Sequence, residues 1–127
     1  MNNKKTVIAV DFDGTVTEKS PYPIVGSVRP KMVWLLRQLK HNYGFSLVLN
    51  TCRTGEYWNE AIHVLKEADL YDLFDWEYVK NKSKHGQYGK IVASFYLDDN
   101  ANLIDFDNID PCVLLNKIVS FVNNKNE

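Results

Sequence analysis

The chain has 127 residues, enough for one domain, and its 45% hydrophobic and 24% charged residues are typical of a globular protein rather than a disordered or fibrous one. A net charge of −1 gives no overall attraction to nucleic acid or to an anionic membrane. We find no apolar run of the ~18 residues that span a bilayer and no signal peptide before the first apolar run, so we expect a single cytoplasmic domain over residues 1–127.

Short apolar runs along the chain are typical of buried strands. They occupy residues 6–10, 46–50 and 95–97, and residues 76–79 form a weaker candidate nearer the edge of a sheet. Each run has at most five residues, which is typical of strands and too short for most helices.

Amphipathic segments lie between and after these runs. Apolar residues at helical spacing predict helices from Pro30 to Tyr43, from about Glu56 to Ala68, and from about Asp110 to Val122. Pro30 suits a first helical turn and Gly44 suits a helix end. This alternation predicts an α/β domain with a parallel sheet and helices on both faces, a Rossmann-like three-layer arrangement.

Polar side chains follow the predicted strands where they end. Asp11 and Asp13 follow the first strand, Thr51 the second, and Asp98 and Asp99 the third. The carboxyl ends of parallel strands meet at one edge of the sheet, and residues two apart in extended chain point to the same side. Carboxylates this close need a counter-charge, and Mg²⁺ prefers such oxygen ligands.

The same strand ends suit a phosphate group. Thr51 has a hydroxyl, the loop after it has backbone N–H groups, and Lys90 has a positive charge. Two carboxylates with these partners suit phosphoryl transfer through an aspartyl-phosphate. The alternative is that each Asp is a turn or helix-cap residue, which explains one strand end more easily than three.

Two residues after Thr51 have open roles. Arg53 either braces this loop or grips a substrate anion with two hydrogen bonds. Cys52 is expected to be a small packed side chain near the site rather than a reactive thiol.

Four segments resemble the signatures of the haloacid dehalogenase (HAD) superfamily of hydrolases. Residues 7–16, with the sequence VIAVDFDGTV, are similar to its first signature, and residues 49–51 to its second. Lys90 is placed like the third, with Lys84 as the alternative, and residues 96–99 resemble the fourth. The order of the four covers the chain from Thr6 to Val122.

This resemblance implies a sheet with strand order 3-2-1-4-5 and a Mg²⁺-dependent phosphatase. Asp11 would be the nucleophile and Asp13 the general acid and base. The metal would be held by Asp11, the backbone carbonyl of Asp13 and Asp98, with Asp99 a nearby or water-mediated ligand. Substrate phosphate contacts are expected from Gly14, Thr51, Cys52, Arg53 and Lys90.

The chain also lacks room for a cap domain, since residues 18–29 are long enough only for a short flap. Capless members have open sites, and they tend to act on large substrates or to cover the site by forming homo-oligomers. We therefore expect a phosphorylated small molecule or a larger phosphorylated substrate, with no membrane partner, and the near-neutral charge disfavours nucleic acid.

Two other functions fit parts of the pattern. One is a catalytically silent HAD-like domain that binds a phosphorylated ligand or a partner. The other is a signalling receiver domain, which also groups Asp, Thr and Lys around Mg²⁺. The order of residues disfavours the receiver, because Lys90 precedes the last Asp pair and no mid-chain strand ends in a lone Asp.

Overall fold

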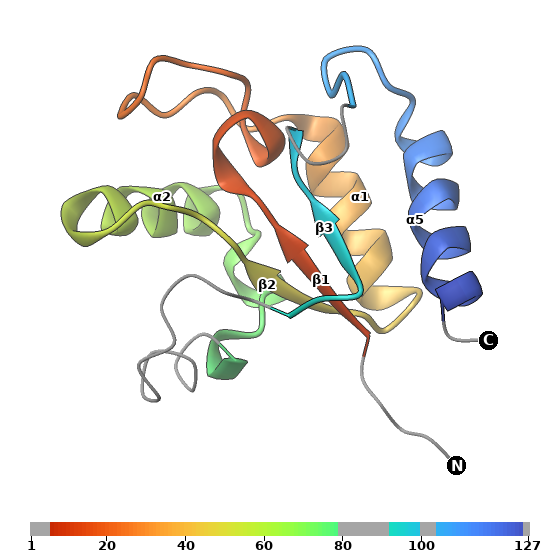
Figure 1. Ribbon diagram of the computed structural model, residues 1–127. Helices are drawn as coiled ribbons and strands as arrows, with labels where there is room; N and C mark the ends of the chain where they lie inside the picture. The colour runs from red at the N-terminus through yellow and green to blue at the C-terminus, as the bar shows by residue number, and fades with distance from the viewer. Residues whose placement is uncertain (1–5, 79–91, 100–103, 126–127) are drawn as a thin grey trace.

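The computed structural model describes residues 6–78, 92–99 and 104–125, and these form an α/β structure (Figure 1). Its elements, in chain order, are β1 (Val7–Val10), η1 (Phe12–Val16), α1 (Pro30–His41), β2 (Ser46–Leu49), α2 (Gly55–Glu67), η2 (Tyr71–Leu73), β3 (Phe95–Leu97) and α5 (Pro111–Lys125). The strands and helices predicted from these parts of the sequence are confirmed, apart from the differences given below.

The three strands form a parallel sheet in the order β2-β1-β3. Ile8 of β1 lies opposite Leu47 on one side and Phe95 on the other. At the carboxyl edge, the Asp11 N–H donates to the Leu97 carbonyl at 2.9 Å and the Asn50 N–H donates to the Val10 carbonyl at 2.8 Å. These two bonds hold the residues that follow all three strands at one edge.

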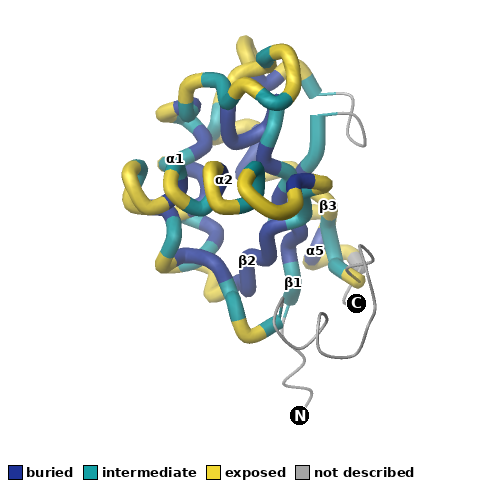
Figure 2. Tube along the Cα trace, turned by 90° about the vertical axis from the view of Figure 1, so that its left-hand side faces the viewer, coloured by how far each residue is buried: buried dark blue, intermediate teal, exposed yellow. Residues whose placement is uncertain are grey.

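One face of the sheet carries the main core. It is formed by alternate strand residues, and the buried residues of the helices belong to the same core. Its strand members are Ile8, Val10, Leu47, Leu49 and Leu97, and its helical members include Met32, Leu35, Leu36, Leu39, Ala61, Leu65, Leu114, Ile118 and Val122. Figure 2 shows β1 and β2 almost wholly buried, with exposed residues on the outer sides of α1 and α2.

The first helix begins and ends where its sequence signals predict, with one difference. Pro30 occupies the first turn of α1, and Gly44 beyond its end has a φ of +67°, which glycine adopts without strain. Tyr43, expected on the apolar stripe, instead lies past the helix and is half exposed, stacking on Phe45. The chain has already turned toward β2 at that point, so the helical spacing no longer applies.

The weaker strand candidate at residues 76–79 is wrong for the residues described. Trp76 to Tyr78 are helical, and the Asp75 carboxylate accepts a hydrogen bond from the Tyr78 N–H at 3.2 Å, as a helix cap does. The Trp76 ring stacks on Tyr71 and its indole N–H donates to the Tyr71 carbonyl. The contact with the sheet comes two residues earlier, where Phe74 forms a parallel bridge with Leu47.

The third layer of helices and the strand order beyond β2-β1-β3 stay predictions. Among the residues described, no helix is both long and apolar enough to cross a membrane.

Candidate metal and phosphate site

Three carboxylates converge at the carboxyl edge of the sheet. Asp11 directly follows β1, and Asp98 and Asp99 directly follow the adjacent strand β3. One carboxylate oxygen from each lies within 4.8 Å of the other two, and all three side chains are partly buried. The parallel pairing of β1 with β3 therefore brings together acidic residues that are nearly ninety positions apart in the sequence.

The pKa of Asp11 is raised well above its ordinary value. Partial burial and the negative charges of Asp98 and Asp99 together raise the pKa of Asp11 from 3.8 to about 7, and burial is the largest cause. The Thr15 hydroxyl opposes this rise by donating a hydrogen bond to Asp11 Oδ2 at 3.1 Å. The same hydroxyl accepts from the Asp99 N–H at 3.0 Å, so Thr15 joins the ends of both strands.

The turn that brings Thr15 to this place is η1. Its residue Gly14 has a φ of +81°, a conformation that L side chains rarely adopt. A Cβ at this position would lie 2.7 Å from Asp99 Oδ2, closer than non-bonded atoms allow. Glycine is thus needed here both for the turn and for the close approach of Asp99.

The two-residue spacing predicted that the Asp13 side chain would converge with Asp11, and this is wrong: Asp13 does not join the three carboxylates. Its side chain instead forms a two-pronged ion pair with Arg53, which follows β2. Arg53 Nε donates to Asp13 Oδ2 and Arg53 Nη2 donates to Asp13 Oδ1, both at 2.7 Å. The Asp13 side chain remains 36% exposed, so one side of the carboxylate faces solvent.

The guanidinium of Arg53 is enclosed on every side. Its side chain has no exposed surface, and its Cζ lies 5.6 Å from the centroid of the Phe12 ring and 5.1 Å from that of the Tyr22 ring. Nη2 also donates to the Pro23 carbonyl at 3.0 Å. Nη1 is buried without a hydrogen-bond partner, 3.8 Å from Glu60 Oε1.

These contacts correct two expectations for the loop after β2. Arg53 does not present a free guanidinium to a substrate anion, because it is buried and committed to Asp13. Cys52 is exposed rather than packed, since its neighbour Arg53 takes the inward position. The Thr51 hydroxyl accepts a hydrogen bond from the Arg53 N–H at 3.2 Å, which braces the loop. Lys90 and Lys84 lie outside the described residues.

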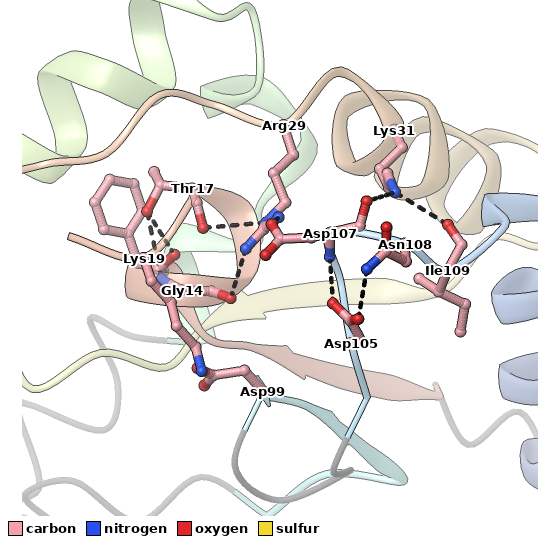
Figure 3. A network of polar contacts seen from close by, with 11 residues as sticks. Gly14, Thr17, Lys19, Arg29, Lys31, Asp99, Asp105, Asp107, Asn108 and Ile109 are labelled. Carbon is pink, nitrogen blue, oxygen red and sulfur yellow. Dashed lines mark hydrogen bonds and ion pairs between the residues drawn. The ribbon is translucent and has the colours of Figure 1, made fainter.

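A second arginine, Arg29, was not singled out from the sequence, and it bonds to the turn that carries Gly14 (Figure 3). Arg29 is buried at the base of the flap, where its Nε donates to the Thr17 carbonyl and its Nη2 to the Gly14 carbonyl. Its Nη1 pairs with Asp107 in the segment before α5. In the sequence, Arg29 stands out only by its position just before Pro30, where a helix is predicted to begin. Nothing in the local sequence identifies Asp107 as its partner.

The flap itself is a short hairpin closed by backbone bonds. Thr17 and Val28 form an antiparallel bridge, and the Glu18 N–H donates to the Ser27 carbonyl at 2.8 Å. Tyr22 and Ile24 near its tip are each about 60% exposed. The flap reaches over Arg53 but is too short to form a separate domain.

A hollow of about 260 Å³ is lined by one of the three carboxylates, that of Asp99. Among its lining residues are Gly14, Lys19, Asp99 and Phe106. The exposed Lys19 ammonium lies 4.0 Å from Asp99 Oδ2, and Figure 3 shows it directed toward that carboxylate. The hollow therefore leaves space for a small ligand next to Asp99.

The donor set fits a hard divalent cation. Three carboxylates this close together repel one another, and the raised pKa of Asp11 reflects burial together with this repulsion. Hard oxygen ligands from carboxylates are typical of Mg²⁺ sites. Among the residues described, no other group of three or more His, Cys, Asp and Glu side chains has this arrangement.

Comparison with known proteins supports the fold without naming a function. No protein-family model matches the chain, and no curated protein matches it. The chain is similar to a solved structure of a conserved protein from Bacteroides thetaiotaomicron, with 28% sequence identity over 92% of each chain and a TM-score of 0.66. The chain therefore shares an α/β architecture with a conserved bacterial protein.

Proposed function

We propose that the chain is a Mg²⁺-dependent phosphomonoester hydrolase of the HAD type, with Asp11 as nucleophile and Asp13 as general acid and base. The observation that carries this proposal is the convergence of Asp11, Asp98 and Asp99 at the carboxyl edge of a parallel sheet. The order β2-β1-β3, with Phe74 bridging to the outer side of β2, is compatible with the centre of a 3-2-1-4-5 sheet.

In the first half-reaction, a carboxylate oxygen of Asp11 attacks phosphorus and the bond to the ester oxygen breaks. Asp13 gives its proton to the departing oxygen, which leaves as an alcohol. In the second half, Asp13 takes a proton from water, whose oxygen attacks the aspartyl-phosphate and frees Asp11 and inorganic phosphate.

The carboxylates of Asp11, Asp98 and Asp99, with the backbone carbonyl of Asp13, would hold Mg²⁺. When bound, the cation supplies positive charge that offsets the charges of these carboxylates and of the phosphoryl oxygens. Thr51 and Lys90 are proposed to contact the phosphoryl group. The substrate would be a phosphorylated small molecule or a larger phosphorylated molecule, because the part of the chain that the structure describes forms no cap domain over the site.

The test is hydrolysis of p-nitrophenyl phosphate, with Mg²⁺ and with EDTA. Wild-type protein should release phosphate only with Mg²⁺, and Asp11→Asn should be inactive while it remains folded. Asp72→Asn makes the same change at an exposed residue of η2 and should keep full activity. Turnover in EDTA, or by Asp11→Asn, would refute the proposal.

The second candidate is a silent domain that binds a phosphorylated ligand without turnover. The observation that favours it is the pairing of both Asp13 oxygens with Arg53, because a carboxylate so paired must free one oxygen before it can carry a proton. Mg²⁺ binding without hydrolysis of any phosphomonoester would support this candidate.

A further inference from the structure

Arg53 connects three parts of the site that are separate in the sequence. It follows β2, pairs with Asp13 in η1, and bonds to Pro23 in the flap. A completely buried guanidinium loses its hydration, so each donor that is paired contributes more than it would at the surface. The ion pair is therefore expected to stabilise the site more than an ion pair on the surface would.

The two prongs of the ion pair are not equivalent. Nη2 carries two hydrogens and has two acceptors, Asp13 Oδ1 at 2.7 Å and the Pro23 carbonyl at 3.0 Å. Nε carries one hydrogen and has a single acceptor, Asp13 Oδ2. Nη2 can thus release Oδ1 and stay bonded to the flap, whereas Nε has no second acceptor among the hydrogen bonds described.

We propose that Arg53 is a positioning residue for the proton transfers of Asp13. Nε anchors Oδ2 and fixes the plane of the carboxyl group, while Oδ1 is released from Nη2 to carry the proton. This inference rests on the proposed hydrolase, and assigns Asp13 one fixed and one working oxygen. The guanidinium also lies over the Phe12 and Tyr22 rings, and these contacts help to keep it in the orientation that this requires.

The same bonds couple the flap to Asp13. The Pro23 carbonyl holds Nη2 in place when Oδ1 is released, and the Tyr22 ring covers the guanidinium. A flap displaced from Arg53 would leave Asp13 less well oriented. The flap then acts on the chemistry through Arg53.

Arg53→Lys tests the inference, because an ammonium keeps the charge but cannot reproduce a planar two-pronged pair. We expect kcat/KM for an alkyl phosphate, whose leaving group needs a proton, to fall about tenfold or more, out of the ~10²–10⁴ that general acid catalysis contributes. For p-nitrophenyl phosphate, whose leaving group needs little protonation, the fall should be under about threefold.

Arg29→Lys is the control matched for burial, since Arg29 is also a buried arginine but pairs with Asp107 rather than Asp13. Arg29→Lys is expected to lower the melting temperature without changing the ratio of kcat/KM for the alkyl phosphate to kcat/KM for p-nitrophenyl phosphate. An equal fall for both substrates in Arg53→Lys, or a changed ratio in Arg29→Lys, would overturn the positioning role.

A measurement that needs no activity separates this inference from the proposed hydrolase. Amide hydrogen exchange at Glu18 and Ile24 reports the flap, since both N–H groups are bonded within it. Exchange there should be faster in Arg53→Lys than in wild type, with exchange in β2 unchanged. If the wild-type protein hydrolyses nothing, this flap result still stands, and unchanged flap exchange would refute the coupling.

Discussion

Replacing Asp11 by asparagine should stabilise the metal-free protein. The Asp11 carboxyl is partly buried and faces Asp98 and Asp99, and its pKa of about 7 shows that its ionised form is disfavoured in the folded state. Asparagine has nearly the same shape and no charge. Its side-chain oxygen can still accept the hydrogen bond from the Thr15 hydroxyl.

The size of the effect follows from the pKa. A carboxyl with a pKa of about 7 when folded and 3.8 when unfolded costs about 4 kcal/mol once it is fully ionised, at about 1.4 kcal/mol for each tenfold change. Because the group is only partly buried, solvent screening reduces this to about 2 kcal/mol. For a chain of this size, that is a rise of roughly 6–10 °C in melting temperature.

The raised pKa of Asp11 also predicts how the stability of the wild-type protein changes with pH. Between about pH 4 and pH 7 the folded state holds a proton on Asp11 that the unfolded chain has lost, so stability falls as the pH rises through this window. The advantage of Asp11→Asn should therefore be largest at pH 8 and vanish near pH 4. Thermal melting of both proteins in EDTA across this range is the assay, with Asp72→Asn as the control for charge.

Mg²⁺ should make the wild-type protein more stable than Asp11→Asn, the reverse of the order expected in EDTA. At about a hundredfold its dissociation constant, the cation stabilises a folded protein by about 2.7 kcal/mol, which exceeds the advantage of about 2 kcal/mol expected for Asp11→Asn in EDTA. Asp11→Asn gains less from the cation, because it lacks one of the three carboxylates that would hold it. If Asp11→Asn melts no higher than wild type in EDTA at pH 8, or if Asp72→Asn gains as much, the argument from carboxylate repulsion is refuted.

Three further changes test the geometry around this cluster. Gly14→Ala should destabilise the protein by about 1–3 kcal/mol in urea unfolding, because alanine resists the φ of +81°, and its Cβ would displace Asp99; weaker Mg²⁺ binding should accompany it, and a neutral effect would contradict the clash. Thr15→Val keeps the side-chain shape but removes the hydroxyl that serves both Asp11 and the Asp99 N–H, so we expect a loss of about 1–3 kcal/mol by the same method. Leu65→Ala, in the buried side of α2, should cost about 2–5 kcal/mol and leave Mg²⁺ affinity of the folded protein unchanged; a change in that affinity would show that the core and the site are coupled.

Local patterns were sufficient for most elements of the fold. The apolar runs of β1 and β2, and the Pro30 and Gly44 signals around α1, depend on neighbours a few residues away, which the sequence displays directly. The strand predicted at residues 76–79 is the exception, although it too depends on residues close in the sequence. The aromatic contacts of Trp76 with Tyr71 and the cap from Asp75 outweigh a weak strand preference.

The convergence of Asp11, Asp98 and Asp99 was also predictable, because parallel strands end at a common edge and each aspartate directly follows a strand. Sequence alone therefore predicted that these three carboxylates meet, but it wrongly placed the Asp13 side chain with them. Only the tertiary structure decided what Asp13 and Arg53 do, since they lie 40 positions apart and either side chain could have faced the ligand. A buried guanidinium needs acceptors, and the fold placed the Asp13 carboxylate and the Pro23 carbonyl within its reach.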